Sequence, residues 1–361
     1  QWGQMATSSS NVGGITASSN ACNGETLCIP VKRTSDDKKM FLLFQSVPFG
    51  PSDRSHVGIN YKELADLDDF RTATDLAKDW DGKLQVTPHP SAYSTMTLDA
   101  DKNIAFFYEE GYSNGGYNMV YKKYAVEEIT KGAYTYADMT SADSTAYLKE
   151  ALGKYVDHMD GLIGDIVGMY TEEARTTLEA ARTAYNDNPC RESYDAFNTA
   201  MSTAQRVEVE PGRKYSFTNY GRSNDQNTYV MTLKADKSYF IGANRNTASL
   251  EKARQHFTFV ATCNEGEYLL YHPESELYFG TLGANETQST PVATTENAGI
   301  FRIESSVEGL SKFNNVNHTG ANLYIHLAGD NTRLVPWSGS DPSMWYISPA
   351  SPSTGIGITE A

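Results

Sequence analysis

The spacing of apolar positions divides the chain into three stretches of different character. From residue 1 to about 136, short apolar runs such as 40–44 and 104–108 stand between Pro, Gly, Asn and Asp, which is typical of β-strands joined by turns. Asp and Asn gather at 99–103 and predict a tight turn before the second run. Small antiparallel sheets repeated at such spacing favour the C-terminal blades of a β-propeller.

Residues 143 to 206 carry apolar residues at steps of three and four, the period of helices that bury one face. Three such patterns begin near Leu148, Leu178 and Tyr194, and the segment 186–189, which ends in Pro, separates the last two. This stretch predicts either a packed three-helix spacer or helices that offer an apolar groove. The packed spacer is the favoured interpretation.

Residues 210 to 350 return to β character and contain an internal repeat. Three strand endings, 257–259, 301–303 and 345–347, each begin with an aromatic residue and follow one another at intervals of 44 residues. Segments 239–242, 277–280 and 323–326 are expected at related places inside the repeats. Three β units of this length predict a β-trefoil with its aromatic strand ends in one core. The tail at 351–361, rich in Ser, Gly and Thr, predicts a linker or a disordered end.

Composition narrows the classes of function. The 361 residues predict several domains, and 45 acidic against 30 basic side chains give a net charge of -15, which excludes a general nucleic-acid surface. No apolar run approaches the roughly 20 residues of a membrane-spanning helix. Cys22 and Cys28 could form a local disulfide bridge. Because the sequence contains no CxxC motif, we expect no metal site, and we expect no cofactor. Because the chain opens on Gln1, we expect a processed product or a piece of a longer protein.

One constellation in the first stretch combines residues of distinct chemistry. Arg54 follows the first apolar run, Tyr93 comes 39 residues later beside Ser94, and Glu109 comes 16 residues after Tyr93 at a strand end. Taken singly, Arg54 would be a surface arginine and Tyr93 a half-buried structural residue. Glu110 competes with Glu109, since strand alternation turns only one of them inward; Glu109 is chosen because it directly follows Tyr108.

This order resembles the C-terminal part of the bacterial-type exo-α-sialidases (neuraminidases), which fold as six-bladed propellers. The resemblance spans roughly residues 20 to 130 and rests on Arg54, the pair Tyr93–Ser94 and the pair Tyr108–Glu109. It implies that Tyr93 is the catalytic nucleophile, that Arg54 binds the substrate carboxylate, and that Glu109 orients another arginine. The implied enzyme is a glycoside hydrolase that releases terminal sialic acid from glycoconjugates with retention.

The chemistry of sialic acid fits these residue types. Its carboxylate, on the anomeric carbon, is matched by the planar fork of an arginine. The same carboxylate would repel an Asp or Glu nucleophile, whereas a neutral tyrosine hydroxyl avoids that repulsion. A tyrosine has an ordinary pKa near 10, so its activation needs a glutamate that takes the proton.

The family's first arginine, its acid/base aspartate, its second arginine and its tyrosine-activating glutamate have no counterpart before Arg54. Arg33 lies too close to Arg54 to be the second arginine, and clean Asp-box repeats are absent. We therefore expect a chain that is inactive alone and completed by an N-terminal companion fragment. The resemblance also implies an extracellular, cell-surface or periplasmic location and sialylated glycans or glycoproteins as partners.

The trefoil offers an alternative function, a non-catalytic carbohydrate-binding or adhesion fragment. Trp345 is similar to the Gln-x-Trp signature of ricin-type lectins, but the Gln is missing from all three repeats. Trp345 and its counterparts Phe257 and Phe301 are thus expected in the core. The side chains expected to contact a ligand are those of Trp337, Tyr220, His272 and Asn315.

Overall fold

The computed structural model of the chain describes residues 24–50, 54–64, 79–111, 115–246, 252–283, 287–318, 320 and 323–350. Cys22 and the predicted tail at 351–361 lie outside these residues. The chain divides into two units, one made of residues 1–158 and 185–189, the other of residues 159–184 and 190–361. Each unit is therefore described by itself.

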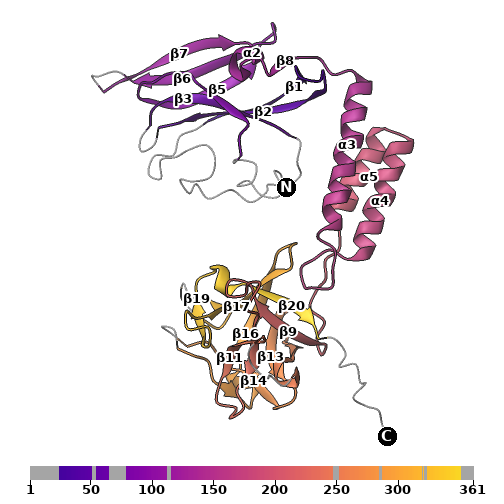
Figure 1. Cartoon of the computed structure of the whole chain (residues 1–361), viewed down its shortest axis with the longest axis vertical. Coiled ribbons are helices and arrows are strands. Elements are labelled where there is room, and N and C mark those ends of the chain that lie inside the picture. Colours follow the sequence, from indigo (N-terminus) through magenta and orange to yellow (C-terminus); the bar gives the residue numbers. More distant parts are fainter. Residues whose placement is uncertain are drawn as a thin grey trace. The chain divides into compact units, whose positions relative to one another are not determined.

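The first unit is built from two antiparallel sheets (Figure 1). Its elements are β1 (Thr26–Arg33), β2 (Lys39–Pro48), β3 (Val57–Glu63), β4 (Gly82–Gln85), β5 (Ser91–Leu98), β6 (Ile104–Gly111), β7 (Tyr117–Tyr124), α2 (Val126–Thr130) and β8 (Tyr134–Tyr136). A five-stranded sheet has the order β4-β3-β2-β1-β8, and a three-stranded sheet has the order β5-β6-β7.

Both sheets share one hydrophobic core. Phe44 of the larger sheet and Met96 and Phe106 of the smaller belong to the same buried cluster, and the hydroxyl of Ser94 donates to that of Ser46 at 2.9 Å. This arrangement of two sheets on a single core differs from the predicted propeller, whose blades are four-stranded sheets around a channel. Strand lengths and turn spacing are alike in the two architectures, and only the pairing between strands separates them.

The local predictions for this unit are confirmed. The run at 40–44 lies in β2 and the run at 104–108 in β6. Between β5 and β6 the Asp99 amide donates to the carbonyl of Asn103 at 2.8 Å, and the Asp99 carboxylate accepts from the Asn103 amide at 2.9 Å. Lys102 adopts a φ of 68°, a left-handed position that such a turn requires.

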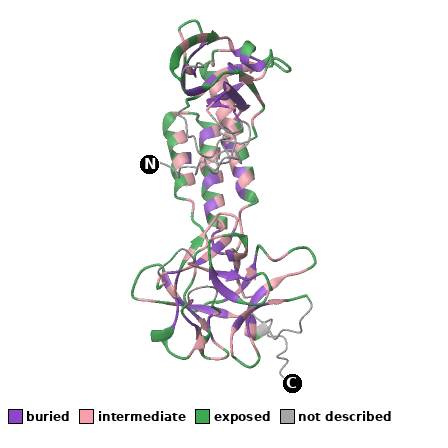
Figure 2. Cartoon of the chain, turned by 90° about the vertical axis from the view of Figure 1, so that its left-hand side faces the viewer, coloured by how far each residue is buried: buried purple, intermediate pink, exposed green. Residues whose placement is uncertain are grey.

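Three helices occupy the stretch with helical periodicity. They are α3 (Ser141–Asp160), α4 (Glu172–Asp187) and α5 (Arg191–Ser202). Figure 2 shows buried positions on the helices. They recur at the spacing of one face in α3 (Leu152, Val156, Met159) and α4 (Ala174, Leu178, Tyr185), and α5 buries Phe197. The stretch does not form a unit of its own, because the division between the two units falls near the end of α3. Among the described residues, no helix combines the length and hydropathy needed to cross a lipid bilayer.

The second unit contains a β-trefoil (Figure 1). Its strands are β9 (Lys214–Asn219), β10 (Tyr229–Leu233), β11 (Phe240–Asn244), β12 (Phe257–Ala261), β13 (Glu267–His272), β14 (Leu277–Phe279), β15 (Pro291–Val292), β16 (Ile300–Ser305), β17 (Leu310–Asn315), β18 (Tyr324–Leu327), β19 (Leu334–Trp337) and β20 (Trp345–Pro349), with short 3-10 helices η2 (Lys252–Gln255), η3 (Thr295–Asn297) and η4 (Asp341–Ser343). Pairing in the order β9-β12-β13-β16-β17-β20 returns from β20 to β9 and closes a six-stranded barrel. The pairs β10–β11, β14–β15 and β18–β19 are the hairpins of three repeats.

The strand endings predicted at intervals of 44 residues form the fourth strand of each repeat. Strand β12 begins at Phe257 and strand β20 at Trp345, and Phe301 is the second residue of β16. All three side chains are fully buried in one cluster. The indole nitrogen of Trp345 donates to the carbonyl of Ile325 at 2.9 Å. The predicted core role of the three aromatic residues is confirmed.

The predicted match among the inner segments is wrong for the first repeat. Segments 277–280 and 323–326 begin the second strands, β14 and β18, whereas 239–242 lies on β11, which is a third strand. The counterpart in the first repeat is β10, where Met231 is fully buried. The segment between β11 and β12, residues 245–256, is longer than its counterparts 293–299 and 338–344, so β11 takes the position that the interval suggests for the second strand.

Replacement of Trp345 by alanine tests the role of this core. Trp345→Ala removes a fully buried ring and its hydrogen bond, so the free energy of unfolding of the trefoil should fall by about 3–5 kcal/mol. Trp337→Ala is the matched control, because Trp337 is 37% exposed and its loss should cost less than about 1 kcal/mol. Chemical denaturation followed by near-ultraviolet circular dichroism measures both. Equal losses in the two variants would contradict the assignment.

Candidate functional site

The three residues singled out in the first stretch come from three neighbouring segments. Arg54 lies just before β3, Tyr93 lies on β5, and Glu109 lies on β6. The pairing of β5 with β6 shifts register between Ser91 and Ser94, so Tyr93 stands in an irregular turn of the strand. Alternation along β5 turns Tyr93 outward together with Thr95 and Thr97, and 43% of the Tyr93 side chain is exposed.

The structure brings these three residues together. The Arg54 guanidinium lies over the Tyr93 ring, with its central carbon 5.3 Å from the ring centroid, a cation–π distance. The Tyr93 amide donates to the Glu109 carboxylate at 3.2 Å. Glu109, rather than Glu110, is the acidic neighbour of Tyr93, since Glu110 accepts from the Tyr108 hydroxyl at 3.3 Å.

Their arrangement differs in one respect from the expected catalytic site. The Glu109 carboxylate binds the backbone of Tyr93, and the Tyr93 side chain lies on the outer face of a three-stranded sheet. We expected these groups at the central channel of a propeller. The cluster presents a guanidinium, an aromatic ring and a carboxylate at the surface, a set that can hold an anionic or hydroxylated ligand.

A second candidate site lies on the third repeat of the trefoil. Cross-strand pairing places Arg302, Asn314, Tyr324 and Trp337 in one row across β16, β17, β18 and β19. Residues paired in this way share a face of the sheet, and the ring of Trp337 ends the row at the surface. The counterparts of Trp337 are Ala243 on β11 and Val292 on β15, so the third repeat alone carries an aromatic residue there among the described strands.

Glu304 is the acidic group beside this row. Its carboxylate accepts from the Asn314 amide at 2.6 Å and from the Tyr324 hydroxyl at 3.0 Å. Burial and this bond to Glu304 raise the pKa of Tyr324 above its usual range. The Lys312 ammonium lies 5.5 Å from the centroid of the Tyr324 ring. We call Glu304, Lys312, Asn314, Tyr324 and Trp337 the Trp337 cluster.

Behind Trp337 lies a buried histidine. The His326 ring is 5.8 Å from the Trp337 ring, and His326 Nδ1 is 2.9 Å from the Ser343 hydroxyl. Because Ser343 donates to the carbonyl of Ser338, Nδ1 of His326 carries the proton of this contact. Burial, followed by the charge of Arg222, lowers the pKa of His326 to about 4, so the ring is neutral at physiological pH.

Two of the four ligand-contact predictions for the trefoil are wrong. His272 is the last residue of β13 and Asn315 the last residue of β17, and both are fully buried. Neither side chain can therefore contact a ligand at the surface. His272 Nε2 lies 3.1 Å from the carbonyl of Arg254, which fixes a loop of the preceding repeat. Trp337 and Tyr220 are exposed, as expected.

The polar members of the Trp337 cluster were not predicted from the sequence. Lys312 and Asn314 alternate with buried residues along β17, and this alternation was the available signal. Glu304 and Tyr324 give no signal by themselves, because their meeting depends on strand register.

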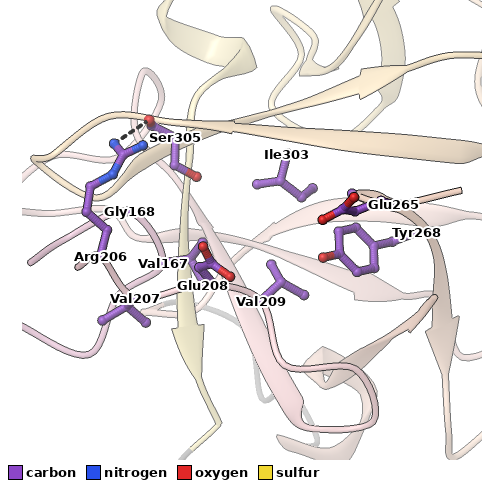
Figure 3. A pocket seen from close by; sticks show the side chains of 11 residues that line it. Val167, Gly168, Arg206, Val207, Glu208, Val209, Glu265, Tyr268, Ile303 and Ser305 are labelled. Carbon is purple, nitrogen blue, oxygen red and sulfur yellow. Dashed lines mark hydrogen bonds between the residues drawn. The ribbon is translucent and has the colours of Figure 1, made fainter. Parts of the chain in front are cut away.

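A cavity of about 350 Å³ lies elsewhere in the second unit (Figure 3). Val167, Val209 and Ile303 supply apolar walls, and Glu208 and Tyr268 supply polar ones. The sequence predicted no site there. The chain around 167–168 is held against the barrel, since the Val167 amide donates to the carbonyl of Ile347 at 3.1 Å. Among the described residues, no group of three or more His, Cys, Asp or Glu side chains is placed to hold a metal ion.

Comparison with known proteins finds similarity to solved structures only. No protein-family model matches the chain, and no curated protein matches it. A Polyporus squamosus lectin, solved bound to a human-type influenza-binding epitope, aligns with 39% of this chain and 50% of its own, at 13% identity and a TM-score of 0.31. The BEL β-trefoil aligns with 39% of this chain and 95% of its own, at 9% identity and a TM-score of 0.31. The similarity thus spans about half the length of the first of these proteins.

The neutral His326 makes stability depend on pH. The unfolded chain takes up a proton near pH 6.5 and the folded chain only near pH 4, so stability is lost as the pH falls through this window. The loss should reach at most about 1.4 kcal/mol per pH unit. His326→Asn should remove this part of the dependence. Urea unfolding of both proteins between pH 7 and pH 4.5 measures it, and identical slopes would contradict the assignment.

Proposed function

We propose that this protein binds carbohydrate and that the Trp337 cluster of its trefoil is a sugar-binding site. The observation that carries the proposal is an exposed indole ring set beside a carboxylate that two neighbours, Asn314 and Tyr324, orient. Neither neighbour is needed for the core, because the core aromatic residues lie on the other face of the same strands. We propose sialylated glycans or glycoproteins, outside the cell or in the periplasm, as partners.

The cluster suits a pyranose for two physical reasons. The face of an indole ring stacks on the apolar C–H side of a sugar, and the exposed Trp337 ring offers such a face. A carboxylate accepts hydrogen bonds from sugar hydroxyls with charge-assisted strength. Glu304 can accept such bonds in a fixed orientation, because Asn314 and Tyr324 already hold its oxygens. Lys312 supplies a donor on the same side.

A second candidate function is exo-α-sialidase activity by a retaining mechanism with a tyrosine nucleophile. The specific observation in its favour is the meeting of Arg54, Tyr93 and Glu109 at one place. In this proposal Arg54 binds the substrate carboxylate. The Tyr93 hydroxyl gives its proton to a glutamate as its oxygen bonds to the anomeric carbon, and the bond to the aglycone breaks as an acid protonates the aglycone oxygen. Water, deprotonated by the same acid/base group, then cleaves the tyrosyl intermediate and releases sialic acid. A companion fragment would supply that glutamate, the acid/base group and the remaining arginines.

Substitutions at the Trp337 cluster test the binding function. Trp337→Ala removes the stacking ring and should weaken sugar binding about tenfold or more, which corresponds to roughly 1.4 kcal/mol. Tyr324→Phe removes only the hydroxyl that holds Glu304 and should weaken binding less. Glycan-array screening followed by titration calorimetry with the best glycan measures both effects.

The second repeat supplies the matched control for this experiment. Tyr278 occupies the position of Tyr324, but its cross-strand partner is Val292 instead of a tryptophan. Tyr278→Phe should therefore leave sugar binding unchanged. Loss of binding in this variant as well, or full binding by Trp337→Ala, would contradict the assignment of the site.

A fluorogenic sialoside tests the second candidate. Tyr93→Phe removes one oxygen from an exposed side chain, so folding should persist while release of the fluorophore falls by about a hundredfold or more. Tyr117→Phe, an exposed tyrosine on the same sheet, is the control and should leave the rate unchanged. Equal rates for wild type and Tyr93→Phe would exclude Tyr93 as the nucleophile. No release by the wild type, alone or with a companion fragment, would exclude catalysis.

A further inference from the structure

The three-stranded sheet of the first unit carries a concentration of exposed apolar side chains. Among the described residues, seven large hydrophobic side chains are exposed, and five of them lie on this sheet. They are Tyr93, Phe107, Tyr117, Met119 and Tyr121. Contiguous exposed apolar groups of this kind mark binding surfaces more often than chance placement does.

Strand register gathers these side chains on one face. Phe107 pairs with Tyr121, and two further pairs follow at Glu109–Met119 and Gly111–Tyr117. The side chains of Phe107, Tyr121, Met119 and Tyr117 therefore point to the same side of β6 and β7. Alternation turns Phe106 and Tyr108 of β6 to the opposite side, where both are buried in the core of the unit. The outer face of the sheet is therefore aromatic over β6 and β7, and we call Phe107, Tyr117, Met119 and Tyr121 the aromatic face.

The rings of the aromatic face are held in place before any ligand arrives. Phe107 and Tyr121 lie 4.6 Å apart between centroids, with their planes inclined by 39°. The Tyr117 ring lies close over Gly111, since a Cβ built there would be 3.2 Å from its Cε1 atom. A Cβ at position 111 would require the ring to shift by a few tenths of an ångström. Rings ordered in this way lose little conformational entropy when a ligand stacks on them.

Carboxylates outnumber cations around the aromatic face. The Lys123 ammonium is paired with the Asp99 carboxylate at 2.6 Å. The carboxylates of Glu109 and Glu25 keep their charge, because they accept from the uncharged Tyr93 amide and Thr95 hydroxyl, and the Arg54 guanidinium over the Tyr93 ring offsets one of them. The remaining negative charge opposes an acidic ligand, so an uncharged ligand suits the surface better than an acidic one. The hydroxyls of Tyr117 and Tyr121 supply hydrogen bonds beside the rings.

We propose that the aromatic face binds an extended, neutral glycan chain. Tyr117 and Tyr121 are four residues apart on β7, which separates them by ~13 Å along the strand, a span longer than one sugar. Rings that carry hydroxyls can stack on the C–H faces of such a chain and bond the hydroxyl groups along its edges. The proposal concerns a different surface from the Trp337 cluster and does not depend on it.

A second copy of the chain is a less suitable occupant. Strand β7 is the edge of its sheet and carries Lys122 and Lys123, and lysines on an edge strand oppose pairing with another sheet. A net charge of -15 on each copy also opposes self-association.

Gel electrophoresis through soluble neutral polysaccharides tests the proposal with the full chain. The probes are a cellulose derivative, a galactomannan and amylose, with alginate as an acidic polysaccharide. The wild type should be retarded by at least one neutral polysaccharide and not by alginate. Tyr117→Ala and Tyr121→Ala should each weaken retardation about tenfold. Tyr117→Phe and Tyr121→Phe keep the rings and should stay within about threefold of the wild type.

Three controls separate the possible outcomes. Circular dichroism melts show whether each alanine variant is folded, and the phenylalanine variants report on the rings if an alanine variant is not. Trp337→Ala should keep polysaccharide retardation, even where it loses binding of a terminal sugar to the trefoil. The proposal is overturned if no neutral polysaccharide retards the wild type, if the alanine variants are retarded as strongly as the wild type, or if light scattering shows a dimer that these variants dissociate.

Discussion

Closure of the trefoil barrel is the constraint on which the second unit depends. Strand β20 pairs with β9 over five positions, from Trp345 opposite Asn219 to Pro349 opposite Tyr215, and so joins the last repeat to the first. Only this pairing brings the three aromatic strand ends into one core, because each belongs to a different repeat. The hairpin of β18 and β19 then has a fixed base, and its outer face can carry the Trp337 cluster. Binding there is possible because burial elsewhere holds the strands in register.

Aromatic residues serve two distinct purposes in this chain, and exposure separates them. Trp345 has no exposed surface and donates to a backbone carbonyl, whereas Trp337, eight residues earlier, has more than a third of its surface in water. A ring held at the surface forgoes the hydrophobic free energy that burial would have gained, and exposed aromatic surface of this kind marks a candidate binding site. The same reasoning applies to the aromatic face of the first unit, although the two surfaces are built on unrelated sheets.

The sequence predicts local features better than it predicts how strands meet. The trefoil could be inferred because three equal intervals leave a visible period, whereas the first repeat was misaligned at 239–242, where a loop of different length breaks that period. His272 looked like a contact residue because a histidine near a strand end is polar, yet the fold buries it to bind a carbonyl. The first unit was expected to be a propeller, since strand length and turn chemistry do not encode which sheets face each other.

The neighbourhood of Tyr93 shows how far residue order can predict a site. Order and spacing placed Arg54, Tyr93 and Glu109 near one another, and the structure has them in contact. The order of residues along the chain could not predict whether Glu109 would meet the hydroxyl or the amide of Tyr93. Catalysis depends on that difference. A nucleophilic hydroxyl needs a base within hydrogen-bond reach of its oxygen, but Glu109 binds the amide of Tyr93. The second candidate function would therefore need a group other than Glu109 to take the proton of the Tyr93 hydroxyl.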